Sequence, residues 1–231
     1  MKQEGLKQQE LFPDMDGGCS NPDDSGETAL FELSVDAYYS ALYARMSELP
    51  IKKEISRFIG KVMKSPTRLD AHRAASDRGD PDVAAVLAAA YKVQHEIHRL
   101  TGLLRFTPNG KGMYIARCSP DHYILPALSD HFFLRFGETK WAIIDEKREL
   151  CLYRGDMAEM PKLVPLPVFL SQTAEEEAAA KETRKEAKRD VWEDLWRLYH
   201  RSVNNEAKKN LRLQQQFMPL RYQKYLPEKG V

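Results

Sequence analysis

The feature that most constrains this chain is a long apolar helix, predicted over residues 80–102. Asp80 followed by Pro81 favours helix initiation, and Gly102 is typical of the residue just after a helix end. Between them, apolar side chains recur with the 3.6-residue period of one buried helix face. Alanines at 84–85 and 88–90 let a second helix or a sheet approach closely. We therefore expect the rest of the chain to be arranged around this helix.

Strand-like runs follow the helix in two pairs. Residues 103–107 and 113–118 flank an Asn-Gly turn, and residues 141–145 and 150–153 flank a short polar turn. Both patterns are typical of β-hairpins. A helix is predicted between the pairs, over residues 122–137, and the three prolines of residues 160–168 favour a linker or an extended edge. We predict an α+β fold, in which a small antiparallel sheet of about four strands (the two hairpins) packs with helices.

The N-terminal part is predicted to be helical. Thr28–Leu33 is a short strand-like run, and Ser34 is a good N-cap for a helix over residues 35–46. Further helices are predicted over residues 51–64 and 68–77 from the spacing of apolar residues and the prolines between them. We treat residues 29–79 as a helical subregion and residues 80–227 as a sheet-and-helix block, both within a single domain over 29–227.

The two ends of the chain differ in charge. Residues 1–28 are polar and acidic, and we predict a disordered tail because they offer little apolar surface to offset the entropy of ordering. Residues 181–231 carry thirteen Lys and Arg residues against seven acids. A helical pattern over residues 174–203 ends in a stripe that includes Trp192, Trp196 and Tyr199, a spacing that is typical of core packing.

The composition argues against several classes of protein. The 231 residues carry a net charge of only +1, so no global signal for nucleic acid or membrane is present. No apolar run is long enough to cross a membrane, so we expect a cytoplasmic protein with free thiols at Cys19, Cys118 and Cys151. We expect no cofactor and no metal site, because His95 and His98 lack an acidic ligand fixed by spacing.

The candidate catalytic residues are His98, Asp121 and His122. Histidine is the side chain that most readily exchanges a proton near neutral pH. Asp121 followed by His122 fits a general base with its orienting carboxylate, and it equally fits a helix N-cap followed by a histidine in the first turn.

Two groups of residues are candidates for binding phosphate. The arginines around the first hairpin either pair with a carboxylate such as Glu96 or Asp121, or hold an anion. The segment 210–222 suits either a nucleic-acid strand or a tail packed on the core. The predicted nucleic-acid- or phosphate-binding residues are Arg99, Arg105, Arg135, Asn210, Gln214, Gln216, Arg221 and Tyr222.

Four segments resemble one bacterial family, the domain of unknown function numbered 4130. They are HEIHRLTGLLRF (95–106), YIARCSPDHYILPALSDHFFLRF (114–136), WAIIDEKRELCLY (141–153) and NLRLQQQFMPLRYQKYL (210–226). The similarity extends over about residues 80–227. The N-terminal part departs from the family pattern at residues 31–42, where Glu32, Leu33 and Ala37 occupy the places of an Asp-Gly and a glycine.

The resemblance implies work on DNA. Members of the family are described as DNA-metabolism proteins, and in bacteria they accompany a radical-SAM protein with helix-hairpin-helix elements or follow a uracil-DNA glycosylase-like domain. The resemblance thus implies DNA as a partner, and a protein of one of these two kinds as a second partner. It transfers no catalytic residue.

Three hypotheses follow from the sequence. The first is a DNA-metabolism or DNA-repair accessory protein that binds nucleic acid or a repair enzyme. The second is an enzyme acting on a nucleotide or damaged base, with His98 or His122 as acid or base and Arg105 and Arg221 holding phosphate. The third is a structural interaction protein without an active site. The sequence leaves open whether any chemistry occurs.

Overall fold

The computed structural model describes residues 24–226 apart from 110–111, 157, 181–190, 204–207 and 209. These residues form two compact units. Residues 24–98 and 121–124 make up the helical unit, and residues 99–120 and 125–226 make up the sheet unit. Of the predicted acidic tail, residues 1–23 lie outside the described residues, and residues 24–28 belong to a helix.

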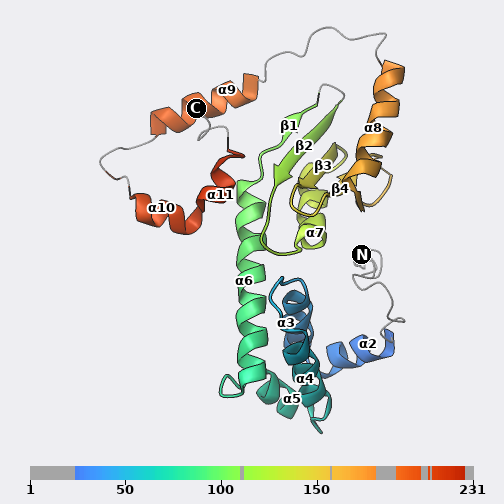
Figure 1. The fold of residues 1–231 in the computed structure, drawn as a ribbon, viewed down its shortest axis with the longest axis vertical. Helices are drawn as coiled ribbons and strands as arrows, with labels where there is room; N and C mark the ends of the chain where they lie inside the picture. Colours follow the sequence, from blue (N-terminus) through green and yellow to red (C-terminus); the bar gives the residue numbers. More distant parts are fainter. Residues whose placement is uncertain are drawn as a thin grey trace. The chain divides into compact units, whose positions relative to one another are not determined.

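The helical unit contains helices from the N-terminal half of the chain (Figure 1). They are α2 (Asp24–Leu33), α3 (Val35–Arg45), α4 (Lys52–Met63), α5 (Arg68–Ser76) and the part of α6 (Pro81–Leu103) up to His98. The helices predicted at these places are confirmed, but the strand predicted at Thr28–Leu33 is wrong. That apolar run forms the last turns of α2 and buries Leu30 in the helical core, a packing that overrides its local strand-like pattern.

Short polar side chains start three of these helices. The Ser34 Oγ accepts a hydrogen bond from the Ala37 amide at 3.3 Å, as predicted, and the Thr67 Oγ1 accepts one from the Asp70 amide at 3.2 Å. Asp80 Oδ1 accepts the Asp82 amide at 2.9 Å at the start of α6. Each contact satisfies a backbone donor that the helix itself leaves unpaired.

Small residues allow the helices of this unit to pack closely. Its buried core combines five alanines of α3 and α5 and several larger side chains, among which Phe58 and Val62 are fully buried. Val83, Val86 and Ala89 supply the face of α6. The predicted apolar stripe of this helix is thus confirmed, although Gly102 lies within the last turn of α6 rather than beyond it.

The sheet unit is built on five strands, whereas the sequence predicted about four. They are β1 (Thr107–Pro108), β2 (Met113–Cys118), β3 (Lys140–Asp145), β4 (Leu150–Arg154) and β5 (Lys162–Pro165), in that spatial order. The second predicted hairpin is confirmed, and the proline-rich segment supplies the edge strand β5. Of the strand predicted over 103–107, only Thr107 pairs with β2, because Leu103 still belongs to α6. The prediction of a purely antiparallel sheet is wrong, because β2 and β3 pair in parallel from Met113 opposite Lys140 to Cys118 opposite Asp145. A helix crossing between them lets successive strands run in the same direction.

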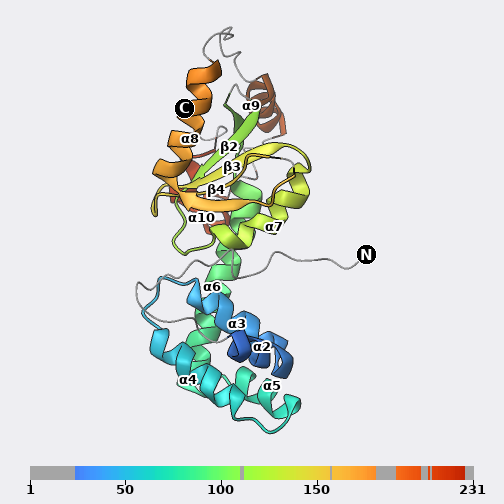
Figure 2. The ribbon, with the colours of Figure 1, turned by 90° about the vertical axis from the view of Figure 1, so that its right-hand side faces the viewer.

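Helices cover both faces of this sheet (Figure 2). Side chains alternate along β3, so Trp141 faces the aromatic rings of α7 (Leu125–Phe136), while Ala142 and Ile144 join Phe169 of α8 (Leu166–Ala180). The four residues Trp141–Ile144 are at most 1% exposed. Burial raises the pKa of the Cys151 thiol on β4 to about 12, which keeps it protonated.

The C-terminal part of the sheet unit is helical. It contains α9 (Val191–Val203), α10 (Leu211–Phe217) and α11 (Leu220–Gln223). Residues 181–190 of the single helix predicted over 174–203 lie outside the described residues. No helix that the structure describes is long and apolar enough to cross a membrane.

A buried ion pair fixes the turn after β3. Asp145 is fully buried, and its Oδ2 accepts a hydrogen bond at 2.8 Å from Arg148, which also donates to the carbonyl oxygen of Pro120 at 3.2 Å. The other Asp145 oxygen accepts the amide of Lys147 at 2.9 Å. The Asp145 carboxylate therefore accepts backbone and side-chain hydrogen bonds of the turn, and Arg148 connects the turn to the segment after β2.

We expect Asp145→Ala to lower the free energy of unfolding of the sheet unit by about 3–5 kcal/mol, because it leaves Arg148 buried without its carboxylate. Denaturant unfolding followed by tryptophan fluorescence measures this, since Trp141 is buried in the same strand. Asp130→Ala, which removes an exposed carboxylate of α7, should change the free energy by less than about 0.5 kcal/mol. Equal effects of the two substitutions would contradict this account of the turn.

Candidate nucleic-acid interface

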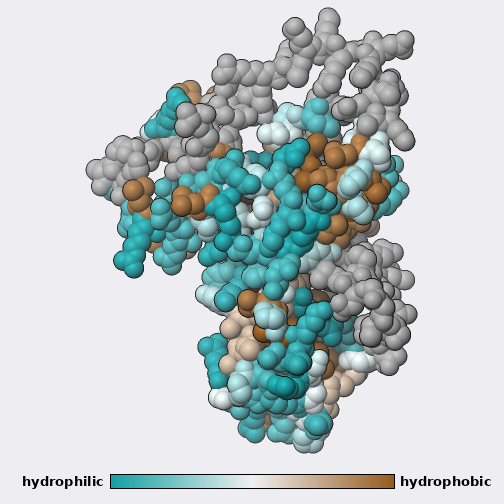
Figure 3. Space-filling view, in the orientation of Figure 1, coloured by the Kyte–Doolittle hydropathy of each residue, from teal (hydrophilic) through white to brown (hydrophobic). Residues whose placement is uncertain are grey.

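One part of the sheet unit combines exposed aromatic rings with cations. We call it the C-terminal surface, and it belongs to the loop after α6 and to α9, α10 and α11, which lie on the side of the sheet unit where α6 ends (Figure 1). Hydrophobic and hydrophilic residues are intermixed there (Figure 3). The C-terminal surface consists of Arg105, Leu195, Trp196, Leu198, Tyr199, Arg201, Lys208, Arg212, Gln216, Phe217, Arg221 and Lys224.

Arg105 is held by the end of α6. Its Nη1 donates a hydrogen bond at 2.8 Å to the carbonyl oxygen of Gly102, one of the last carbonyls of the helix. Its guanidinium carbon lies 5.5 Å from the ring centroid of Trp196, within range of a cation–π interaction. Arg105 therefore links the helix end to α9, and Glu96, the carboxylate considered as its partner, lies in the helical unit bound to other groups.

The two described aromatic side chains of α9, Trp196 and Tyr199, are exposed. Trp196 is 40% and Tyr199 is 56% exposed, and their ring centroids are 5.9 Å apart. Leu195 and Leu198 are also exposed. The prediction that this stripe packs in the core is therefore wrong for the described part of α9.

The polar motif at the C-terminus divides into structural and exposed residues. Asn210 is the N-cap of α10, because its Oδ1 accepts the Leu213 amide at 3.0 Å. Tyr222 is 1% exposed, as expected for a tail packed on the core, and its hydroxyl accepts a hydrogen bond from Arg221 at 3.2 Å. Gln214 is half-buried and Gln216 is exposed on α10. The packed-tail interpretation is thus confirmed for Tyr222, and the nucleic-acid interpretation stays a prediction for the exposed residues.

A second tyrosine anchors the segment to the sheet. The Tyr225 hydroxyl donates a hydrogen bond of 2.6 Å to Glu146, the residue after β3. The same carboxylate lies 3.5 Å from Arg117 of β2 and 3.6 Å from Lys224. Leu226, the residue after Tyr225, is buried. The exposed residues of α10 and α11 are therefore attached to the rigid end of two strands.

The anchor perturbs both of its partners. The hydrogen bond from Tyr225, together with the charges of Lys224 and Arg117, lowers the pKa of Glu146 below that of an ordinary glutamate. Burial raises the pKa of Tyr225, and the hydrogen bond to Glu146 raises it further. The pair is thus ionised on the glutamate and neutral on the tyrosine at neutral pH.

Two of the predicted catalytic residues lie in the helical unit, in a loop held by Glu96. This glutamate of α6 is 2% exposed, and its two oxygens accept the amides of Asp121 and His122, both at 2.8 Å. The His122 Nδ1 accepts the Glu48 amide at 3.4 Å, which fits the tautomer with its proton on Nε2. In that form the imidazole presents a donor rather than a base. The N-cap interpretation of Asp121 is wrong, because α7 begins four residues later, at Leu125.

His98 is exposed on α6, two residues after Glu96. Two residues correspond to about 200° around a helix, so His98 leaves α6 on roughly the opposite side from Glu96 and its loop. Arg99 is half-buried in the last turns of α6, and Arg135 is exposed at the end of α7, both in the sheet unit. Convergence of the predicted catalytic and phosphate-binding residues stays a prediction, since they belong to different units. Within the described ranges, no group of three or more His, Cys, Asp and Glu residues is arranged to hold a metal ion.

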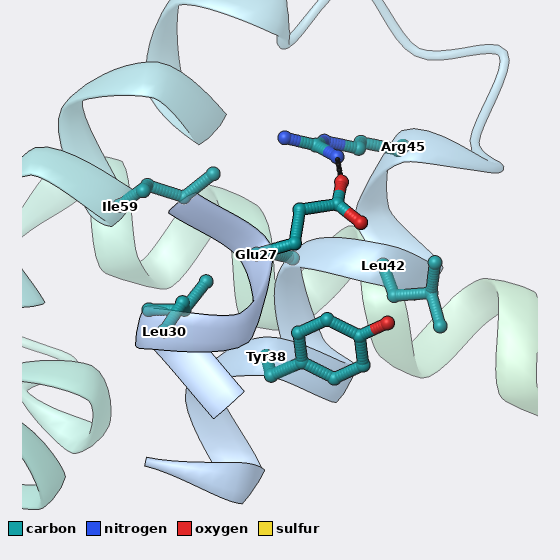
Figure 4. Close-up of a pocket in the computed structure, with 7 residues that line it drawn as sticks. Glu27, Leu30, Tyr38, Leu42, Arg45 and Ile59 are labelled. Atoms are coloured by element: carbon teal, nitrogen blue, oxygen red, sulfur yellow. Dashed lines mark hydrogen bonds and ion pairs between the residues drawn. The ribbon is translucent and has the colours of Figure 1, made fainter. Parts of the chain in front are cut away.

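A small pocket lies in the helical unit (Figure 4). It encloses about 220 Å³ of empty space including open solvent, and Leu30, Tyr38 and Ile59 contribute to its wall. Its two charged residues, Glu27 and Arg45, pair with each other. We assign it no function.

The sequence analysis missed two features of the C-terminal surface. The exposure of Trp196 has no signal in periodicity, because a solvated stripe and a buried one have the same spacing. The only sequence signal for the anchor between Tyr225 and Glu146 was weak. It was the presence of an acidic residue directly after a buried strand. The pairing of Arg117 with Glu146 was not predicted.

Comparison with known proteins places the chain in one family. The family described as domain of unknown function DUF4130 matches residues 52–228, from α4 to the C-terminal segment. No curated protein and no solved structure matches the chain.

We expect Tyr225→Phe to loosen the C-terminal segment without unfolding the sheet. Loss of one hydrogen bond to a carboxylate costs about 1 kcal/mol when it is partly exposed, so amide exchange of residues 218–226 should accelerate about fivefold at neutral pH. The pKa of Glu146 is lowered by folding, so its stabilisation is present above the ordinary glutamate pKa. The difference between the variant and the original should therefore shrink as the pH falls through the lowered pKa of Glu146.

Tyr114→Phe is the matched control, because it removes a hydroxyl from an exposed tyrosine of β2. It should leave exchange of residues 218–226 unchanged. An effect of Tyr225→Phe that does not depend on pH would show that Glu146 is not the partner that matters.

Proposed function

The chain belongs to the DUF4130 family, and we propose that it is a DNA-metabolism or DNA-repair accessory protein that binds DNA through the C-terminal surface. The observation that carries the proposal is the pairing of cations with solvent-exposed aromatic rings, above all Arg105 with Trp196. The sequence resemblance, which implies work on DNA, supports the same conclusion.

The local charge of this surface supports a polyanionic ligand. Between residues 195 and 226 the sequence has seven Lys and Arg residues and one acidic residue, Glu206. The described residues of this range include no Asp or Glu at all. A phosphate backbone releases counterions when such cations approach it, which drives association even though the whole chain carries a charge of only +1.

The residues predicted to bind phosphate divide into arginines of the C-terminal surface and residues that hold the C-terminal segment in place. Arg105, in the loop after α6, and Arg221, in α11, are fixed by hydrogen bonds to the Gly102 carbonyl and the Tyr222 hydroxyl. Prior fixing lowers the entropy lost when an arginine binds a phosphate oxygen. Asn210 and Tyr222 instead support the surface from within. We propose that Arg105 and Arg221 contact phosphate and that Asn210 and Tyr222 position the segment.

We expect the protein to bind labelled DNA with an affinity that falls steeply between about 50 mM and 200 mM salt. Arg105→Ala and Arg221→Ala should each weaken binding and reduce the slope of log affinity against log salt by about 1. Fluorescence anisotropy with single-stranded and double-stranded DNA, each with and without one uracil, measures the affinity, the slope and any preference for a uracil-containing site.

Arg78→Ala is the matched control, because Arg78 is an exposed arginine of the helical unit. It should leave both affinity and slope unchanged. Absence of binding at low salt, or binding that salt does not affect, would reject the proposal and direct attention to a role carried by a protein partner.

A further inference from the structure

Trp196 and Tyr199 form an open aromatic platform on α9. Their rings are 5.9 Å apart with an angle of 34° between their planes, and both side chains are at least 40% exposed. Two adjacent rings that are tilted by 34° and exposed together present apolar surface to solvent.

The platform has a cation on it. Arg105 lies over the Trp196 ring at 5.5 Å, and its hydrogen bond to the end of α6 keeps it there. Arg201 and Lys208 are also exposed elsewhere on the C-terminal surface. A stacking face with an arginine over it matches the two halves of a nucleotide, a flat base and a phosphate.

We propose that this platform binds unpaired bases, so that the C-terminal surface prefers single-stranded DNA over duplex. The proposal rests on the DNA binding proposed above and names the form of DNA that the same surface takes. Tryptophan and tyrosine rings stack on the face of any base, and arginine adds a cation–π contribution. In a duplex each base face is already covered by its neighbours, so only a single strand offers free faces to Trp196 and Tyr199.

The chemistry of the platform favours this ligand over an amphipathic protein helix. An apolar partner helix would cover Trp196, but it would place its own apolar face against Arg105 without a counter-charge. A single strand supplies both a base and a phosphate at each position. The charge of the surface therefore complements DNA, and a protein partner becomes one outcome of the test.

The test compares the binding of a mixed-sequence single strand of about 15 nucleotides with that of its duplex at low salt, by fluorescence anisotropy on the full chain. We expect Trp196→Ala to weaken single-strand binding about five- to 150-fold, the range for loss of one stacked base, and to change duplex binding much less. Trp196→Phe should recover part of the affinity, because phenylalanine keeps a stacking face.

Val203→Ala is the control, because it shortens an apolar side chain on the same helix that is 57% exposed, carries no ring and lies outside the C-terminal surface. Far-ultraviolet circular dichroism of each variant checks that α9 and the rest of the fold persist. Equal loss of single-strand and duplex binding in Trp196→Ala, or no loss in either, overturns the stacking platform while leaving DNA binding in place. Failure of the unmodified protein to bind either form overturns the proposed function itself, and with it this inference.

Discussion

Two consecutive acidic residues at the end of β3 fix the arrangement of the sheet unit. Asp145 is turned inward, where Arg148 neutralises it and joins the turn to Pro120 after β2. Glu146 is turned the other way, where it receives Tyr225 and Arg117, and its amide donates to the Cys118 carbonyl at 2.9 Å. Alternation along a strand sends neighbouring side chains to opposite sides, so one short sequence serves the interior and the C-terminal segment at once.

This arrangement places the exposed cations on a firm base. Several apolar side chains of residues 210–226, among them Leu211, Phe217 and Leu220, are exposed, so Tyr222, Leu226 and the Tyr225 hydroxyl supply the attachment. Once the segment is attached, Lys224 lies 3.6 Å from Glu146, while the described residues between 195 and 226 supply no acid of their own. Net charge over the whole chain conceals this local excess, because the acidic residues lie mainly elsewhere in the sequence.

Residue patterns predict some parts of this structure and not others, for physical reasons. The helix from Pro81 was predictable because its cap, its proline and its apolar period all agree. The hairpins were predictable from their turns, but the parallel pairing of β2 with β3 was not, because turn residues specify only neighbours within a hairpin. The predicted helix between the hairpins was nevertheless a crossover of the length that parallel strands need, and it could have indicated the pairing.

The candidate site was predictable in its cations and not in its aromatic rings. Arg105 and Arg221 were identifiable as candidates from the residues around them. An amphipathic stripe such as that of α9, in contrast, has the same residue spacing whether it is buried or exposed. Exposure of this stripe has a consequence for stability. An isolated helix of 13 residues is marginal in water, and most helices are stabilised by packing an apolar face. A ligand that covers Trp196 and Tyr199 would therefore stabilise α9 as it binds, so that affinity for a single strand and the order of this helix are coupled.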